Sequence, residues 1–567
     1  MPTWHPGAHV ITRNRPRLLL SPIAIPALFV VISLILGNYY WKPLEGLSID
    51  DSYIFLQYAK NLAERGDLSF NTGDRSLGVT SLAWTLVLAA AHRIFCASPV
   101  TEAHLLGAIL LGVAASYWTA TFRRLGGGWM LSSLIGVALV TDPFLVRHSI
   151  SGMESALNLT ILSVLVFHLS GSLRSRGALT GILIGVAYLT RPDNLVSLPA
   201  LFVAALIARP TDLKAPFRDH WREWVSLLWG FAIVFLPFSL WSLLRVGSLV
   251  PPTRIGKLLV FLPSRYGLTF EQFNSLGMAA HISIALKCFT QGILPMFTTE
   301  CERTVLPVVL IGVCSLPILS LKRWHHRALC MFLSIYSIGL VLAYALFFPL
   351  VKDRHLSNLH SVAIAGTGML ALYFRRQLPP GTVLSTGRLS FASIRSMPVV
   401  IGGVLGISFV ATLFFLGHYR AGYLKRVANI KVWCLTGTWL SSHAPPQARV
   451  ALEPMGAIKY CSGMYVLDMG GLATRETWQS ISQGQGGALE PIHQLLRAER
   501  IDYIVDHHPS EWLGRLADEF RNDYHLVARI SPPPQERAFG ATDVFDVFAT
   551  QWGVAGATHE MVGESSH

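Results

Sequence analysis

The stretch SPIAIPALFVVISLILGNYYWKPLEGLSIDDSY, residues 21–53, places a long apolar run shortly before two adjacent carboxylates, Asp50 and Asp51. An α-helix needs about 20 predominantly apolar residues to cross a bilayer, and this run is of that order. Carboxylates just outside such a helix are costly to desolvate, so they are usually retained for chemistry or for binding a cation. The acidic pair is therefore the first candidate functional feature of the chain.

Composition indicates a membrane protein with many spans. Of 567 residues, 52% are hydrophobic and only 14% are charged, and the mean hydropathy is +0.45. A soluble globule does not have such a composition. The formal net charge of +13 comes from Lys and Arg clustered between apolar segments, where they set membrane topology. We therefore expect membrane lipids, and no nucleic acid, as partners.

The distribution of basic residues predicts about eleven spans within residues 18–420. Residues 1–17 carry three arginines and are interpreted as a cytoplasmic tail, so the first loop, residues 40–78, falls outside. No small-residue cleavage site follows the first apolar run, so that helix is expected to remain as an anchor. Residues 79–95 are apolar enough to span, but a span there would invert everything that follows. We expect that segment to pack at the outer face or to cross incompletely.

The topology also predicts the location of the protein and of its C-terminal part. We expect the cytoplasmic (inner) membrane, with the functional loops and a soluble α/β domain, residues 425–553, on the extracytoplasmic side. Residues 554–567 are predicted to be a disordered tail. Within the α/β domain, β-rich runs cover residues 449–452, 465–469, 501–505 and 544–549, and helical patterns cover residues 491–500 and 511–522.

The seven cysteines are too few for a disulfide scaffold. The expected topology leaves two pairings open on the outer side, Cys288 with Cys301 and Cys434 with Cys461. The sequence does not decide whether either bridge forms.

The first outer loop, IDDSYIFLQYAKNLAERGDLSFNTGDRSLGVTSLAW at residues 49–84, resembles that of the GT-C class of polyprenyl-phosphate-sugar-dependent membrane glycosyltransferases. Within that class the chain is most similar to the branch containing the mycobacterial terminal arabinofuranosyltransferases. Further matches follow in order at residues 151–154, 190–193 and 247–251 and at Arg354-His355, so the resemblance covers most of the chain. Ser52 and Pro252 depart from the family pattern, which leaves the sugar and the acceptor open.

The resemblance implies an enzyme with a GT-C-like catalytic domain of α-helical spans. It would transfer a sugar, arabinofuranose-like or another, from a polyprenyl-phosphate donor to an extracytoplasmic glycan or lipid-linked acceptor, with inversion at the anomeric carbon. A transporter or flippase of lipid-linked saccharide is the alternative. That function predicts repeats and charges near the middle of the spans, whereas the charges here lie mainly at the outer ends.

Such a transfer needs a carboxylate to accept the hydroxyl proton and cations to stabilise the departing phosphate. Asp51 or Asp50 is the candidate base, and Glu154, at an outer helix start, is the candidate for orienting the acceptor. If the loops converge, these three carboxylates are also the candidate ligands of a divalent cation, Mg or Mn. The structural alternatives are a helix-start cap for the pair and a helix-dipole contact for Glu154.

The candidate donor-binding residues are cations and aromatic side chains near the outer ends of apolar runs. The basic ones are Arg191, Lys257, Arg354 and His355, and the aromatic ones are Tyr53 and Tyr58. Arg191 could instead satisfy Asp193 across a helix break, and Arg354 could instead reach lipid headgroups. The tyrosines could stack on a sugar or flank the lipid entrance, although aromatic residues are common at membrane interfaces.

Overall fold

The computed structural model describes most of the chain between residues 24 and 553. The described ranges are residues 24–75, 77–171, 177–207, 215–249, 253–288, 306–322, 326–347, 352–377, 397–453, 455–473, 489–510 and 513–553, with single residues 290, 477 and 480. The predicted tails, residues 1–17 and 554–567, lie outside them.

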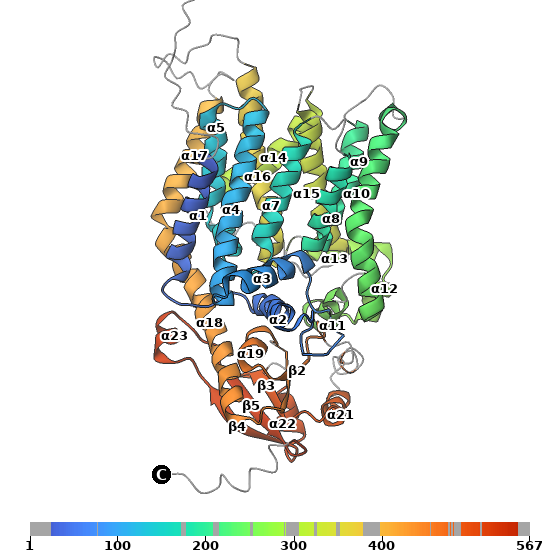
Figure 1. The fold of residues 1–567 in the computed structure, drawn as a ribbon, viewed down its shortest axis with the longest axis vertical. Coiled ribbons are helices and arrows are strands. Elements are labelled where there is room, and N and C mark those ends of the chain that lie inside the picture. The colour runs from blue at the N-terminus through green and yellow to red at the C-terminus, as the bar shows by residue number, and fades with distance from the viewer. Residues whose placement is uncertain are drawn as a thin grey trace, which may run out of the picture.

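A bundle of helices forms the larger part of the molecule (Figure 1). Among the described residues, four helices are long and apolar enough to cross a membrane: α1 (Ala24–Trp41), α4 (Pro99–Arg124), the Trp221–Val246 part of α10 (Ala215–Val246), and α15 (Arg327–Phe347). The protein is thus a multi-pass membrane protein. The remaining bundle helices are α5 (Trp129–Thr141), α6 (Pro143–Ser149), α7 (Ser155–Leu169), α8 (Gly177–Thr190), α9 (Ser197–Ile207), α14 (Leu306–Leu321), α16 (Ser357–Arg376) and α17 (Met397–Phe414).

The predicted count of about eleven spans is not confirmed: among the described residues, several apolar helices are shorter than a full span, and some are broken. Helices α5 and α6 meet at a bend of 57°, and they count as a fifth span only if taken together. The bend lies at Asp142-Pro143, where proline cannot donate a backbone hydrogen bond and Asp142 accepts one from Leu145 N at 2.9 Å. A similar break at Arg191-Pro192 leads from α8 into a short 3₁₀ helix, η2 (Pro192–Val196). Such breaks place polar residues at helix ends.

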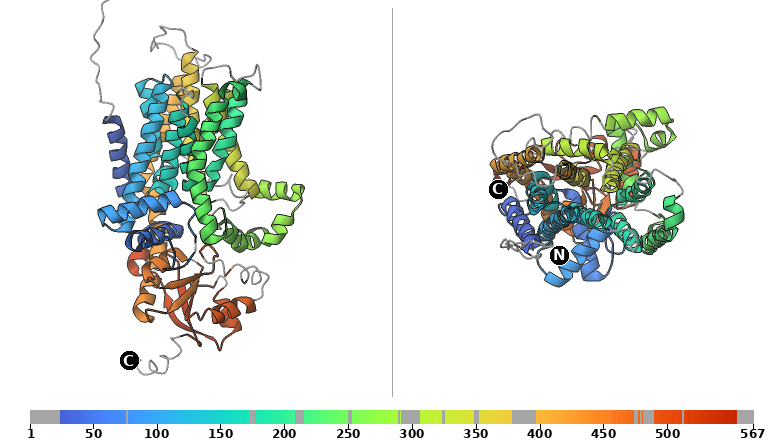
Figure 2. Two further views of the ribbon diagram at one scale, coloured as in Figure 1. Left: turned by 45° about the vertical axis from the view of Figure 1, so that its right-hand side comes forward. Right: turned by 90° about the horizontal axis from the view of Figure 1, so that it is seen from above.

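Two helices lie across one end of the bundle. They are α2 (Asp50–Arg65) and α3 (Leu82–Phe95), and Figure 1 and the left view of Figure 2 show them between the bundle and the C-terminal part. The crosswise position of α3 shows that this helix does not run along the bundle, whereas the expectation that residues 79–95 pack at the outer face stays a prediction. Ser52 Oγ donates to Ser151 O at 2.7 Å, and Trp84 Nε1 donates to Gly152 O at 2.8 Å. These contacts fasten α2 and α3 to the loop before α7.

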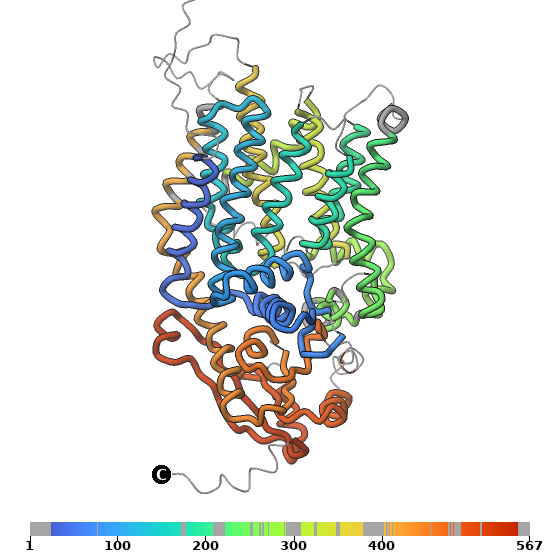
Figure 3. The backbone as a smooth tube through the Cα atoms, in the orientation of Figure 1, coloured from blue at the N-terminus to red at the C-terminus, as the bar shows by residue number. Residues whose placement is uncertain are grey.

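The C-terminal part is built on one mixed sheet, reached through the long helix α18 (Leu416–His443), as the tube in Figure 3 traces. The strand order is β2-β1-β3-β5-β4, with β1, β2 and β3 parallel and β5 antiparallel to both of its neighbours. The strands are β1 (Arg449–Leu452), β2 (Tyr465–Asp468), β3 (Tyr503–His507), β4 (Tyr524–Ile530) and β5 (Phe545–Thr550), and the helices are α19 (Met455–Ser462), α21 (Glu490–Ala498), α22 (Arg515–Glu519) and α23 (Pro534–Ala538). We call these strands and helices the C-terminal unit.

Sequence patterns predict most of the C-terminal unit. Each of the four β-rich runs contains or overlaps a strand, and the run at residues 449–452 coincides with β1. The prediction misses β4, an edge strand with only one buried residue, because such a strand carries little apolar signal. The helical pattern at residues 511–522 is also too long, since within the described residues 513–522 only α22 forms.

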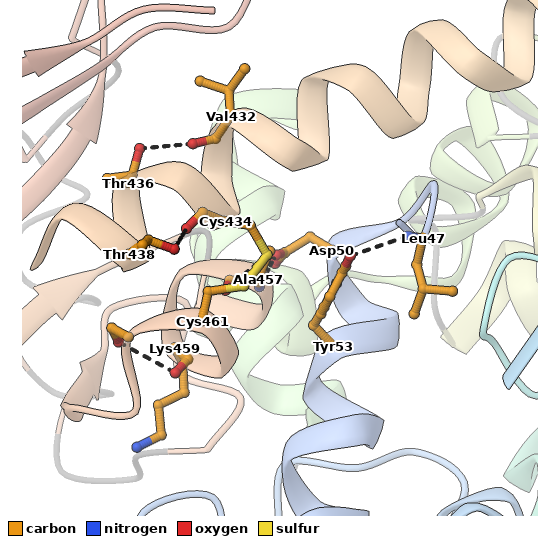
Figure 4. The surroundings of a disulfide bond; sticks show 11 residues. Leu47, Asp50, Tyr53, Val432, Cys434, Thr436, Thr438, Ala457, Lys459 and Cys461 are labelled. Atoms are coloured by element: carbon orange, nitrogen blue, oxygen red, sulfur yellow. Dashed lines mark hydrogen bonds between the residues drawn. A yellow bond between two sulfur atoms is a disulfide. The ribbon is translucent and has the colours of Figure 1, made fainter. Parts of the chain in front are cut away.

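A disulfide joins Cys434 of α18 to Cys461 of α19 (Figure 4). It is one of the two pairings that the sequence leaves open. The other pairing involves Cys301, which lies outside the described residues. The bridge fixes α19 against the helix that leads out of the bundle.

Candidate active site

Three cations from two segments converge on one oxygen of Asp51, near the start of α2. Lys257 of α11 (Thr253–Tyr266) places Nζ 3.4 Å from Asp51 Oδ2, and Lys352 places Nζ 4.0 Å from the same atom. Arg354 Nη2 forms the closest of these contacts, an ion pair with a hydrogen bond to Oδ2. Arg354 belongs to the 3₁₀ helix η5 (Asp353–Leu356), which precedes α16. We call these four side chains the Asp51 cluster.

The Asp51 cluster has more positive than negative charge. Burial acts to raise the pKa of Asp51, but Lys257, Lys352 and Arg354 outweigh it and hold that pKa well below its usual value. Burial lowers the pKa of Lys257 to about 8, although Asp51 acts in the opposite direction. Asp51 is therefore ionised at neutral pH, and the cations around it outnumber it. Such a cluster favours the binding of a further anion.

Asp50 has quite different partners from its neighbour. Its carboxylate accepts hydrogen bonds from Gly456 N at 3.0 Å and Ala457 N at 2.6 Å, in the first turn of α19. Free N–H groups at a helix start attract a carboxylate. Burial nevertheless raises the pKa of Asp50 to about 7, against the effect of the Ala457 hydrogen bond. The N-cap of α2 itself is Ile49, so the structural alternative, a cap of that helix by the pair, does not describe Asp50.

A second group of charges surrounds Arg191, which lies between α8 and η2. Arg191 forms an ion pair with Glu154 through Nη1, and its Nη2 lies 3.1 Å from Asp193 Oδ2. The same nitrogen donates to Tyr344 Oη at 3.0 Å, and that hydroxyl donates to Asp193. Among the described residues, the second oxygen of Glu154, Oε2, is buried and has no hydrogen-bond partner. We call these four side chains the Arg191 cluster, in which two carboxylates face one cation.

His355 lies between the two clusters. Its ring stacks on Tyr344 with centroids 5.3 Å apart, and its Nδ1 accepts from Lys352 N at 3.3 Å. Burial lowers the pKa of His355 well below its usual value, and the positive charges of Arg191, Arg354, Lys257 and Lys352 lower it further. His355 is therefore neutral at neutral pH. Because Nδ1 accepts from Lys352 N, the ring proton of the neutral imidazole lies on Nε2, which can donate a hydrogen bond there without adding charge.

Asp353 braces the backbone beside Arg354. Its Oδ1 accepts from Arg354 N at 2.8 Å, and its Oδ2 lies 3.1 Å from Arg426 Nη1 of α18. Arg147 and His148 of α6 lie 3.8 Å and 3.5 Å from the same oxygen. This carboxylate thus holds η5 to α6 and α18, which fixes the origin of the Arg354 side chain.

The two candidate tyrosines are buried in the first loop. Tyr53 Oη accepts from Leu47 N at 3.1 Å, and Tyr58 Oη accepts from Gly78 N at 2.7 Å. Within the described ranges neither hydroxyl joins the ion pairs of Asp51. The contacts assign both side chains to shaping the loop, and their predicted donor contacts stay predictions.

The three carboxylates proposed as metal ligands are held by different partners. Asp50 faces α19, Asp51 is enclosed by cations, and Glu154 pairs with Arg191. In the part of the chain that the structure describes, no group of three or more His, Cys, Asp or Glu side chains is placed to hold a metal ion. The three therefore do not fit a shared cation site in this arrangement, and no step below uses a metal.

From the sequence, five candidate residues are expected near one another only because the predicted topology puts them on the same side of the membrane. They are Lys257, Arg354, His355, Arg191 and Glu154. The structure brings all five to the end of the bundle that carries α2. It adds three residues that the sequence did not single out: Lys352 and Tyr344 at the clusters, and Asp353, whose carboxylate holds Arg354. Asp193, which the sequence offered as an alternative partner of Arg191, does contact it. The run Lys352 to His355 contains three basic side chains in four residues, and that density was a usable signal for Lys352.

Comparisons with known proteins bear on the fold. The crystal structure of ArnT from Cupriavidus metallidurans bound to undecaprenyl phosphate aligns with a TM-score of 0.57 at 10% identity, over 92% of this chain and 97% of that one. The apo state of the same protein aligns with a TM-score of 0.54 at 11% identity, over the same shares. The mycobacterial arabinofuranosyltransferase AftD aligns with a TM-score of 0.45 at 14% identity, over 92% of this chain and 39% of AftD.

Sequence comparisons add less. Residues 423–549 match a family model described as a domain of unknown function (DUF8728). No curated protein sequence matches the chain. The structural likeness to ArnT supports the GT-C fold that the first loop led us to expect, and it does not single out the mycobacterial branch. The chain is a multi-pass membrane protein with a GT-C-like fold.

Proposed function

We propose that this protein is a membrane glycosyltransferase that takes its sugar from a polyprenyl-phosphate donor. The observation that carries the proposal is the convergence of Lys257, Lys352 and Arg354 on a single oxygen of Asp51. A fold shared with a protein that was solved with undecaprenyl phosphate supports this class of ligand. The polyprenyl tail would stay among the apolar helices while the phosphate reaches the cations at their end.

The donor phosphate would compete with Asp51 for its cations. A phosphodiester carries one negative charge and unesterified oxygens that accept charge-assisted hydrogen bonds. As Lys257 and Arg354 turn to the phosphate, Asp51 loses the contacts that hold its pKa down. Its pKa then rises, and its carboxylate becomes a better proton acceptor. Donor binding would in this way prepare the base.

The transfer itself would be one displacement. The acceptor hydroxyl oxygen attacks the anomeric carbon, and its proton passes to the Asp51 carboxylate. The bond between the anomeric carbon and the phosphate oxygen breaks, and its electron pair remains on that oxygen. The cations that hold the phosphate stabilise the charge that develops there. Attack from the face opposite the phosphate inverts the anomeric configuration.

Hydroxyl groups of a sugar need hydrogen-bond partners beside the phosphate site. Glu154 Oε2 is a buried acceptor without such a partner among the described residues, and it belongs to the cluster on the far side of His355. We assign Glu154 to a sugar or acceptor hydroxyl for this reason. An arabinofuranose-like sugar, a glycan or lipid-linked acceptor, and an extracytoplasmic site follow from the first-loop resemblance and from the basic-residue topology, and they belong to the same proposal.

A transfer assay with the purified protein in nanodiscs tests the proposal. A panel of polyprenyl-phosphate sugars is offered with a mixture of glycan acceptors, and release of polyprenyl phosphate is followed. We expect release with one sugar of the panel and loss of release in Asp51→Asn. If no donor of the panel is consumed, the transferase proposal falls, and movement of lipid-linked saccharide between leaflets of the same nanodisc preparation becomes the function to measure.

A further inference from the structure

Helix α11, which carries Lys257, packs against the C-terminal unit. Ile255 and Leu259 lie one helical turn apart and join the apolar core formed by Leu467 and Met469 of the sheet and its following residues. Leu259 is buried there. Apolar contact of this kind fixes the distance between a helix and a sheet, because protein interiors are close-packed.

The closest approach is between two backbones, at Gly256 and Gly471. A Cβ atom built on Gly256 would lie 2.1 Å from Gly471 O and 2.6 Å from Gly471 C, and both of these are backbone atoms. Only glycine fits such a contact without a shift of the chain. Helix α11 therefore rests directly on the turn at residues 470–473.

The buried carboxylate of Asp468 gives this turn its shape. It accepts hydrogen bonds from Gly470 N at 2.7 Å and Ala473 N at 2.6 Å, and a further one from Leu472 N. Asp468 is fully buried at the end of β2. Three hydrogen bonds to one carboxyl group hold the turn more firmly than the loop backbone would by itself. The turn that contacts α11 is thus held in one conformation by Asp468.

We propose that the C-terminal unit positions Lys257, through the Asp468 turn and the Gly256–Gly471 contact, at the distance from Asp51 that donor binding requires. Lys257 follows Gly256 directly, so a displacement of the helix at Gly256 moves Lys257 with it. The inference rests on the proposed function for its meaning, since the donor phosphate is what Lys257 would meet. The inference gives a role to residues 423–549, which match a family model whose description states no function.

A second contact of the C-terminal unit, between α19 and Asp50, also supports this positioning of the site. The first turn of α19 holds Asp50, the residue next to Asp51, and the Cys434–Cys461 disulfide fixes α19 to α18. The C-terminal unit therefore touches the site from two sides, at α2 and at α11. The contact at α2 and the contact at α11 together set the distance of 3.4 Å between Lys257 Nζ and Asp51 Oδ2.

The titration of Lys257 provides a readout that needs no substrate. Burial is the main cause that lowers its pKa from the ordinary 10.5 to about 8; Asp51 on α2 acts to raise this pKa, and Lys352 and Arg354, at the start of η5, act to lower it. The pH dependence of Lys257 acetylation by acetic anhydride, followed by peptide mass spectrometry, measures this midpoint in the full-length protein. The variants are Gly256→Ala and, as a matched control, Gly422→Ala in α18, where an added Cβ meets nothing within 4 Å.

We expect a midpoint near pH 8 in the wild type and in Gly422→Ala, and a midpoint shifted toward 10.5 in Gly256→Ala as Lys257 leaves its buried place. An unchanged midpoint in Gly256→Ala would overturn the inference. Should Gly256→Ala fail to fold, Leu259→Ala loosens the same contact without a backbone collision. A smaller shift in the same direction supports the inference, and no shift refutes it.

Undecaprenyl phosphate binding separates the two proposals. If both hold, Gly256→Ala binds undecaprenyl phosphate about tenfold more weakly than Gly422→Ala, as one charge-assisted contact is lost. If the midpoint shifts but the wild type does not bind this lipid, the proposed function fails while the positioning of Lys257 stands. If the wild type binds and Gly256→Ala binds equally well, the positioning inference fails and the proposed function stands.

Discussion

The Asp51 cluster and the Arg191 cluster lie on either side of His355 and have opposite charge balance. The first surrounds one carboxylate with three cations, and the second surrounds one cation with two carboxylates and a tyrosine hydroxyl. The first can therefore receive an anion by releasing Asp51, whereas the second already satisfies its cation and keeps one carboxylate oxygen for a neutral hydroxyl. A donor with a phosphate at one end and a sugar at the other matches this division.

The largest effect should come from Asp51, because in the proposed transfer its carboxylate accepts the proton of the reacting hydroxyl. We expect Asp51→Asn to lower kcat by about 10²- to 10⁴-fold, the usual contribution of a general base. Its affinity for undecaprenyl phosphate should hold or increase, since the cations lose a competing anion. Asp518→Asn, at an exposed helix position, is the matched control and should keep wild-type kcat. If Asp51→Asn lost lipid binding together with kcat, Asp51 would be needed for the folded structure of the site instead of for catalysis.

A smaller effect, on kcat more than on lipid binding, is expected at Glu154. Glu154→Gln removes the charge that faces Arg191 and weakens the hydrogen bond to a substrate hydroxyl. A charge-assisted hydrogen bond contributes about 1.5–3 kcal/mol, which corresponds to a loss of about 10- to 100-fold in kcat. Undecaprenyl phosphate affinity, measured for Glu154→Gln beside Arg354→Gln, should fall only in the second variant. Equal losses would show that the two clusters form one phosphate site and would break the comparison.

The pH dependence of donor binding should report Lys257. Its pKa is about 8 without ligand, and a bound phosphate adds a negative charge that raises it. Binding then takes up a proton above pH 8, so affinity should fall as pH rises through 8, by at most about tenfold per pH unit. Titration of undecaprenyl phosphate binding from pH 6.5 to 9.5 measures this. Lys257→Arg stays charged over that range and should flatten the profile. A wild-type profile without a decline would remove Lys257 from the phosphate site.

The smallest effect on activity is expected at Asp50, despite its place beside Asp51. Asp50→Asn keeps an oxygen for one of the two α19 amides, so kcat should fall less than about threefold and stability by about 1 kcal/mol. Because the folded-state pKa of about 7 lies above the ordinary 3.8, wild-type stability should rise as pH falls from 7 toward 4. Thermal unfolding over that range should show this rise in the wild type and less of it in Asp50→Asn. A kcat loss as large as that of Asp51→Asn would restore Asp50 as a candidate base.

The contrast between the two aspartates shows what could be predicted from the sequence. Polar side chains at the ends of apolar runs marked Asp51, Glu154, Arg191, Lys257 and Arg354, because a membrane segment leaves few other places for charge. The same pattern could not separate Asp50 from Asp51. Their roles depend on Gly456 and Ala457, more than 400 residues away in the chain, which reach α2 only through the tertiary fold.

Local patterns also predicted four of the five strand segments of the C-terminal unit but not its contact with α11. Its β-rich runs could be recognised because a soluble α/β fold alternates strand and helix periods. The packing of this unit against α11 depends on the close contact of Gly256 with Gly471 and on the turn that Asp468 holds. Neither feature produces a periodic pattern in the sequence. Asp353 was missed for a similar reason, since a carboxylate between two basic residues resembles an ordinary charged loop.

The most direct test compares the binding of undecaprenyl phosphate and undecaprenol, which has a hydroxyl in place of the phosphate, to the wild type and to Arg354→Gln in nanodiscs. We expect the wild type to bind the phosphate much more tightly than the alcohol, and Arg354→Gln to lose most of that difference. Equal binding of the two lipids by the wild type, or an undiminished preference in Arg354→Gln, would contradict a phosphate site at the Asp51 cluster.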